Sequence, residues 1–135
     1  MQKRIEISHF NYSNNKLELK AEQTEFDTTG LSASGQMLVD SDSLAFIYKL
    51  ENEQEFIYVS LNSDLWPSLK NIIAEKQQVF LHLDDNHEIE LIDIIPELEY
   101  LLQNIEGNAN YGEEMVELVE KTFLSHSVED EKITD

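Results

Sequence analysis

Two segments near the middle of the chain, residues 44–50 and 56–61, are apolar or aromatic at nearly every position. A half-exposed strand alternates apolar and polar residues, so continuous apolar runs of this length indicate strands that are covered on both faces. The polar sequence Glu51-Asn52-Glu53-Gln54 separates the two runs and predicts a turn. We therefore expect these strands to be central in a sheet, and any fold of this chain must cover both of their faces.

Four shorter segments alternate apolar and polar residues, which is the pattern of half-buried strands. Residues 5–7 and 17–19 flank an Asn-rich stretch, and residues 79–83 and 89–91 flank the polar bend Asp84-Asp85-Asn86-His87. Each pair predicts a hairpin. Residues 22–34 show no periodicity and consist of polar and small residues, which predicts a long loop.

Helical periodicity occurs in three places. The first helix, residues 65–73, buries Trp66, and the second helix covers residues 96–105. The third is capped by Asn110 and runs to Phe123. The predicted fold is therefore an α+β domain with a mainly antiparallel sheet of about six strands and three helices, in the order ββββαββαα.

The length of 135 residues suits one domain, which we place at residues 1–124. Residues 125–135 are acidic and lack apolar periodicity, so we predict a disordered tail. Residues 1–4 resemble the basic start of a signal peptide, but residues 5–9 alternate apolar and polar side chains where a signal peptide needs a continuous apolar stretch. We therefore expect a cytoplasmic protein.

The charge balance excludes several functions. Nine Lys and Arg oppose 28 Asp and Glu, which gives a formal net charge of -19. Binding to a nucleic-acid backbone or to anionic lipid needs clusters of Lys or Arg, so we expect neither direct nucleic-acid binding nor membrane docking. The absence of Cys removes disulfides, thiolate metal sites and cysteine nucleophiles.

Signatures of catalysis are also missing. The sequence holds no G-x-S-x-G nucleophile elbow, and Gly30 and Gly35 lie without the Lys of a phosphate-binding loop. Asp40-Ser41-Asp42-Ser43 begins like a calcium loop but lacks its Gly and distal Glu, so we expect an Asx turn there. We predict no catalytic residue and no cofactor, and a non-enzyme is favoured over an enzyme.

Most of the net negative charge of the domain lies in its second half. Between Gln77 and Glu120 the sequence has twelve acidic residues and no Lys or Arg. This distribution predicts a surface that docks on a basic protein partner, with specificity from exposed aromatic residues, and mimicry of a nucleic acid is one form of such docking. An acidic face that serves only solubility explains the same composition. The candidate docking residues are Tyr100, Tyr111, Glu113, Glu117 and Glu120.

A metal site is the alternative function. If Leu83 pairs with Ile89, the aliphatic side chains of both strands share one face, and His82 lies opposite Glu90. Imidazoles and carboxylates are suitable ligands for zinc, manganese or iron, although a solvated acidic turn has the same composition. The candidate metal ligands on this hairpin are His82, His87, Glu88 and Glu90.

Two segments of the chain resemble an uncharacterised family of small acidic proteins from Gram-positive bacteria. They are Gly35-Gln36-Met37-Leu38-Val39-Asp40-Ser41-Asp42 and Asn104-Ile105-Glu106-Gly107-Asn108-Ala109-Asn110-Tyr111-Gly112-Glu113-Glu114. The likeness runs from about Gly30 to Phe123, and the N-terminal hairpin looks particular to this chain. The resemblance implies a cytoplasmic bacterial protein, and it assigns no activity, cofactor or catalytic residue to any position. The sequence thus predicts a non-catalytic, regulatory protein-interaction module, with a metal-binding or metal-dependent protein as the alternative.

Overall fold

The computed structural model describes residues 3–124, so the predicted tail at 125–135 lies outside the described residues. Seven strands and three α-helices confirm the α+β class. The strands are β1 (Arg4–Ser13), β2 (Lys16–Ala21), β3 (Ser32–Asp40), β4 (Ala45–Glu51), β5 (Phe56–Asn62), β6 (Gln78–Asp84) and β7 (His87–Glu90). The helices are α1 (Trp66–Glu75), α2 (Ile94–Ile105) and α3 (Glu113–Phe123), with short 3-10 turns η1 (Ser63–Leu65) and η2 (Ala109–Tyr111).

The strands form one mixed sheet in the order β3-β4-β5-β1-β2-β6-β7. Strands joined by short turns pair antiparallel, whereas β1 pairs parallel with β5 and β2 pairs parallel with β6. The prediction of about six strands in the order ββββαββαα is therefore wrong in detail. A further strand is present, and the β1–β2 hairpin is inserted between β5 and β6, so the crossover through α1 passes two strands.

Strand β3 is the strand that the sequence did not predict, because its first third lies in the expected loop. Ser32, Ala33 and Ser34 have no large side chain to form a hydrophobic face. The ladder to β4 is also irregular between Ala33 and Met37, where Gly35 has a positive φ of 77°. A bulged edge strand of small residues has neither alternation nor strong β propensity, so its pattern is that of a loop.

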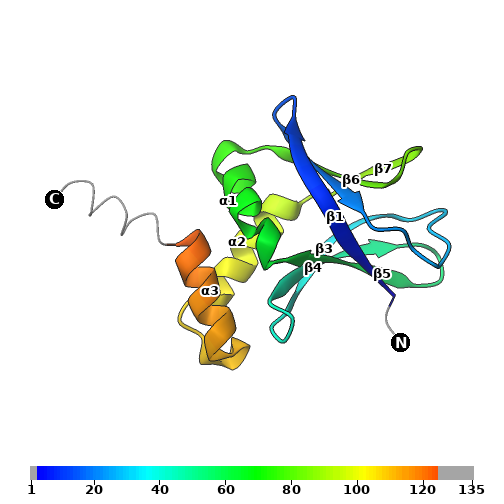
Figure 1. Ribbon diagram of the computed structural model, residues 1–135. Helices are drawn as coiled ribbons and strands as arrows, with labels where there is room; N and C mark the ends of the chain where they lie inside the picture. Colours follow the sequence, from blue (N-terminus) through cyan, green and yellow to red (C-terminus); the bar gives the residue numbers. More distant parts are fainter. Residues whose placement is uncertain (1–2, 125–135) are drawn as a thin grey trace.

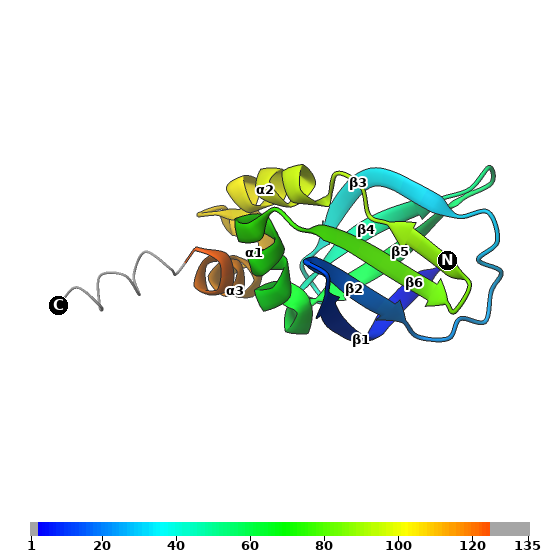
Figure 2. The same ribbon diagram turned by 90° about the horizontal axis from the view of Figure 1, so that it is seen from above.

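The sheet curls, and the three helices gather at one end of it (Figures 1 and 2). The edge strands β3 and β7 contact each other without pairing, and α2 packs on β3. Two hydrogen bonds connect β3 and β4 to the segment that follows β7. The Tyr48 hydroxyl donates to the Ile92 carbonyl at 2.6 Å, and the Glu97 carboxylate accepts from the Met37 amide at 3.0 Å.

The core fills the space between the curled sheet and the helices. Trp66 is fully buried, as predicted, and its ring centroid lies 5.0 Å from that of Phe46 and 5.7 Å from that of Phe123. The central strands are buried on both faces for most of their length, which confirms their predicted central place. No helix within residues 3–124 is long and apolar enough to cross a membrane.

Two helix starts differ from the prediction. Helix α2 begins at Ile94, so Pro96 lies within its first turn, where the missing N–H leaves no intrahelical hydrogen bond unmade. Asn108, rather than Asn110, is the capping residue: its side-chain oxygen accepts from the Asn110 amide at 3.0 Å and starts η2. Gly112, with a φ of 92°, then leads into α3.

Candidate functional site

The β6–β7 hairpin has a different register from the predicted one. Leu81 pairs with Ile89, so His82 lies opposite Glu88, and Glu90 lies opposite Phe80. The predicted pairing of His82 with Glu90 is therefore wrong by two residues. A register shift between His82 and Asp84 gives the hairpin an extra residue near its turn, and this irregularity sets the observed register.

A third strand contributes a carboxylate to His82. The parallel pairing of β2 with β6 places Glu18 beside it, and Nε2 of His82 lies 2.8 Å from Oε1 of Glu18 and 3.3 Å from Oε2 of Glu88. The side chains of Glu18 and His82 are 22% and 28% exposed, and that of Glu88 is 45% exposed. We call these three residues the carboxylate–histidine cluster.

The other predicted ligands lie outside this cluster. His87 pairs with Asp84 at the end of the hairpin. The Glu90 carboxylate accepts a hydrogen bond from the side-chain amide of Gln78 at 3.2 Å. Among residues 3–124, the ligand atoms that gather within 4.8 Å of one another are those of Glu18, His82 and Glu88. The structure thus brings together two of the four predicted metal ligands and adds a carboxylate from β2.

The electrostatics of the cluster favour an ionised Glu18. The hydrogen bond with His82 lowers the pKa of the Glu18 carboxyl, and the charge of Lys16 acts in the same direction. A single imidazole nitrogen faces two carboxylates, and its one N–H can donate fully to only one of them. The arrangement can therefore hold either a proton shared with the carboxylates or a cation bound by all three groups.

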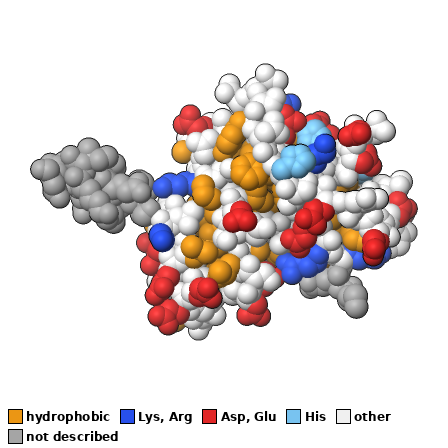
Figure 3. Space-filling view, in the orientation of Figure 1, with side chains coloured by type: hydrophobic (Ala, Val, Ile, Leu, Met, Phe, Trp, Pro, Cys, Tyr) orange, Lys and Arg blue, Asp and Glu red, His pale blue; other side chains and the backbone are white. Residues whose placement is uncertain are grey.

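The predicted docking residues lie on the α2–α3 end of the molecule, where acidic side chains gather over α3 in Figure 3. Tyr100 is 64% exposed, and Glu113 and Glu117 are exposed one turn apart on α3. We define the acidic helical surface as the exposed carboxylates of this region. Its members are Glu99, Glu106, Glu113, Glu114 and Glu117.

Two of the predicted docking residues make contacts within the chain. Tyr111 is half-buried and packs against the hydrophobic core. The Glu120 carboxylate accepts a hydrogen bond from the Gly107 amide at 2.9 Å and so connects α3 to the end of α2. These residues position the two helices, and the exposed members of the predicted set are Tyr100, Glu113 and Glu117.

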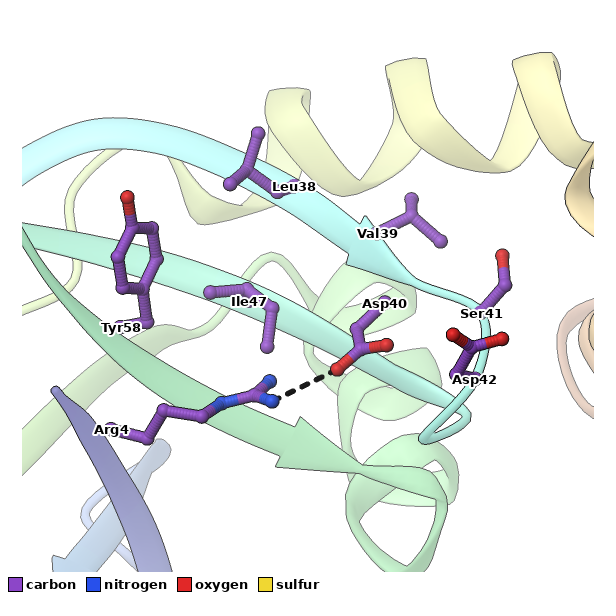
Figure 4. Close-up of a pocket in the computed structure, with 8 residues that line it drawn as sticks. All are labelled: Arg4, Leu38, Val39, Asp40, Ser41, Asp42, Ile47 and Tyr58. Atoms are coloured by element: carbon purple, nitrogen blue, oxygen red, sulfur yellow. Dashed lines mark ion pairs between the residues drawn. The ribbon is translucent and has the colours of Figure 1, made fainter. Parts of the chain in front are cut away.

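A separate hollow of about 380 Å³ lies on the outer face of β3, β4, β5 and β1 (Figure 4). Nη1 of Arg4 lies 3.0 Å from Oδ2 of Asp40, and Ile47 and Tyr58 line the apolar side of the hollow. Burial raises the pKa of Asp40, but hydrogen bonds from Arg4 and Ser43 outweigh it, so the pKa lies below its usual value. Because Asp40 neutralises Arg4, this hollow offers no net positive charge to an anion.

The Asp40 side chain also bears on one local prediction. Its Oδ1 accepts a hydrogen bond from the Ser43 amide at 3.2 Å, so a side-chain bond to the backbone holds the turn as expected, although it reaches three residues on and not the two of an Asx turn. Neither the role of Glu18 nor the Arg4 hollow was predicted from the sequence. Alternation along residues 17–19 places Glu18 on the solvent side of a strand, but no local signal pairs that strand with β6, which lies about sixty residues further on.

Comparisons with known proteins match nearly the whole described chain. A family described as "Family of unknown function (UPF0738)" matches residues 5–123. A UPF0738 protein of Bacillus cytotoxicus and one of Bacillus mycoides are each 46% identical over 124 residues, which cover 92% of this chain and 100% of each relative. A UPF0738 protein of Bacillus anthracis matches equally well in identity and coverage. No solved structure matches the chain.

The matched range corrects one expectation. The family match begins at Ile5, so the N-terminal hairpin is shared with relatives and is not particular to this chain. The fold explains why, because β1 and β2 lie between β5 and β6 and connect the two halves of the sheet. Removing this hairpin would leave two separate sheets.

Proposed function

Because this chain belongs to the UPF0738 family, whose function is unknown, we propose a function from its own surface. It is a non-catalytic, regulatory protein-interaction module of the cytoplasm that docks its acidic helical surface on a basic surface of another protein. The proposal rests on the charge of that surface, its lack of internal neutralisation and an exposed aromatic residue beside it.

The uncompensated charge carries the proposal. The five carboxylates of the acidic helical surface take part in none of the ion pairs found within residues 3–124. From Ile94 to Glu120 the sequence has no Lys or Arg, and Lys121 in the last turn of α3 is the first cation. Like charges that are left together raise the free energy of the folded state, and a basic partner relieves this repulsion.

Tyr100 offers an apolar contact surface in addition to the electrostatic attraction of the carboxylates. Its side chain is 64% exposed on α2, next to Glu99 of the acidic helical surface. A tyrosine combines a large apolar face with a hydroxyl group and loses little conformational entropy on binding, which is why tyrosines are frequent at the centres of protein interfaces. Electrostatic attraction would speed the encounter, and Tyr100 would supply short-range specificity.

One form of this function is mimicry of a nucleic acid. In that case the carboxylates of the acidic helical surface occupy the sites at which a DNA- or RNA-binding protein places its Lys and Arg against phosphates. Binding would then compete with nucleic acid and would weaken as salt is added.

Capture of partners with a matched pair of variants tests the proposal. The test variant carries Glu106→Gln, Glu113→Gln and Glu117→Gln, and leaves Glu120 intact because its carboxylate binds the Gly107 amide. The control carries Glu22→Gln, Glu25→Gln and Glu53→Gln, three exposed residues in loops at the opposite end of the molecule (Figure 2). Both variants have the same net charge, so only the position of the charge differs.

Full-length wild type and both variants are immobilised, exposed to bacterial cytosol at about 10 mM and about 150 mM salt, and the bound proteins are identified by mass spectrometry. We expect a basic partner that is held by wild type and by the control, is reduced several-fold by the test variant and is weakened by salt. Equal capture by all three proteins, or capture that salt does not change, contradicts the proposal.

A further inference from the structure

We propose that Glu18, His82 and Glu88 form a binding site for a divalent transition-metal ion such as Zn²⁺, on the outer face of the sheet where β2, β6 and β7 adjoin. The inference is independent of the docking proposal, because the cluster lies on strands and the acidic helical surface lies on α2 and α3. It also uses a different ligand set from that predicted by the sequence, since Glu18 replaces His87 and Glu90.

The distances from the His82 imidazole to the two carboxylates are close to those that a metal requires. Ligand atoms about 2.0 to 2.2 Å from a tetrahedral zinc ion are separated from one another by about 3.3 to 3.6 Å. Nε2 of His82 lies 3.3 Å from Oε2 of Glu88 and 2.8 Å from Oε1 of Glu18. A shift of roughly half an ångström at Glu18 therefore completes the required separation from His82.

The backbone holds the three ligands on adjacent strands. His82 lies directly opposite Glu88 in the antiparallel β6–β7 ladder, and Glu18 lies one diagonal step away in the parallel β2–β6 ladder. Side chains at such positions are within reach of one another across a sheet. Because the ladders fix the backbone, binding of a metal would require adjustment of side chains alone.

Space and charge next to the cluster suit an ion that keeps water ligands. A hollow of about 260 Å³ adjoins it, and Glu18, His82, Asp84 and Asp85 line that hollow. Open positions on a three-ligand ion can hold water in such a hollow. Lys20 also lines the hollow and is the neighbour of His82 in the ladder, so its positive charge opposes a bound cation.

The chemistry of the ligands selects the class of ion. One imidazole and two carboxylates suit zinc, manganese or iron, whereas calcium and magnesium prefer oxygen ligands throughout. Metal binding needs a neutral imidazole with a free Nε2 lone pair. The hydrogen bond between His82 and Glu18 would then be exchanged for two bonds to the metal.

Calorimetric titration of the full-length chain with ZnCl₂, after treatment with a chelator and its removal, tests the site. We expect one equivalent of Zn²⁺ to bind and a thermal stabilisation that accompanies it. His82→Ala and Glu18→Gln should each weaken this binding by at least about tenfold, because the first removes a ligand and the second replaces a charged carboxylate with a weaker, neutral amide oxygen. Glu88→Gln, at the most exposed ligand, provides a third variant that leaves the half-buried pair intact.

The matched controls lie on the same hairpin. His87→Ala and Glu90→Gln remove one imidazole and one carboxylate that the structure leaves outside the cluster, and both should bind Zn²⁺ as wild type does. Lys20→Gln should tighten binding because it removes the opposing charge. Circular dichroism of each metal-free variant verifies that the fold is kept.

The outcomes separate a built site from adventitious binding. Absence of binding to the wild type at millimolar ZnCl₂ overturns the proposal. Loss of affinity that is equal for His82→Ala and His87→Ala, or binding that survives removal of each of the three ligands, also overturns it. A visible absorption spectrum of tetrahedral Co²⁺ that wild type shows and Glu88→Gln loses would support the ligand set without relying on stability.

Discussion

Replacing Trp66 with alanine should destabilise the protein more than any exposed substitution, because its side chain joins the sheet to the helices. The indole is fully buried, packs on Phe46 and Phe123, and donates its Nε1–H to the Leu61 carbonyl at 3.1 Å. Truncation of a buried Trp costs about 3 to 5 kcal/mol through lost burial and the cavity that remains. A buried carbonyl left without its donor adds about 1 kcal/mol or more.

We therefore expect Trp66→Ala to lower the free energy of unfolding by about 5 kcal/mol, a large part of the roughly 5 to 15 kcal/mol of a typical domain. Urea unfolding followed by far-ultraviolet circular dichroism measures it, because the variant has no tryptophan fluorescence. Trp66→Phe keeps most of the packing and should lose about 1 to 3 kcal/mol, chiefly through the hydrogen bond.

The exposed Tyr100 provides the comparison, since Tyr100→Ala should change stability by no more than about 0.5 kcal/mol. A loss below about 2 kcal/mol in Trp66→Ala, with an unchanged dependence on urea, would refute the packing described for the core. Native fluorescence with the emission maximum of tryptophan in water would refute the burial of Trp66 directly.

Three further predictions concern charge, pH and backbone geometry. Stability at neutral pH should rise between about 10 mM and about 150 mM salt, because the Debye length falls from about 30 Å to about 8 Å and the repulsion between carboxylates is screened. This rise should be smaller in the variant with Glu106→Gln, Glu113→Gln and Glu117→Gln. Thermal melts at both salt concentrations measure the difference. Burial raises the pKa of Tyr48 to about 12 from an ordinary value of 10.0, so the folded state favours the neutral phenol. The contribution of the Tyr48 phenol to the free energy of unfolding should therefore be fully present below pH 10 and should be lost between about pH 10 and 12. Unfolding experiments on Tyr48→Phe should lack this part of the decline. Gly35→Ala should cost about 1 to 3 kcal/mol in urea unfolding, because the residue has a φ of 77° and an added Cβ would lie 3.1 Å from Oδ2 of Asp93; an unchanged midpoint would contradict the bulge geometry.

Local pattern in the sequence determined most of the elements. The continuous apolar runs predicted the buried strands β4 and β5, and helical spacing predicted three helices with Trp66 inside the core. Tyr100, which was predicted to be an exposed aromatic residue, likewise lies on the surface. These features depend on residues within one element, so burial of an apolar face is sufficient to predict them.

Pairing between strands that are distant in the sequence was decided only by the tertiary structure. The parallel pairs β1–β5 and β2–β6 join segments about fifty to sixty residues apart, and no alternation pattern encodes which strand becomes a neighbour. The carboxylate–histidine cluster depends on the second of these pairs. Glu18 could therefore not be assigned to His82 from the sequence.

The register of the β6–β7 hairpin shows the same limit at shorter range. The predicted and observed registers differ by two residues, and a shift of two keeps every aliphatic side chain on the core face. Hydrophobic alternation is satisfied equally by both, whereas the polar partner of His82 changes from Glu90 to Glu88. The sequence by itself thus determined which residues of the hairpin face the core. The irregular turn, together with packing on the neighbouring strand, decided which polar side chains meet. The reason is that burial depends only on the face of the strand, whereas contact between side chains depends on the register.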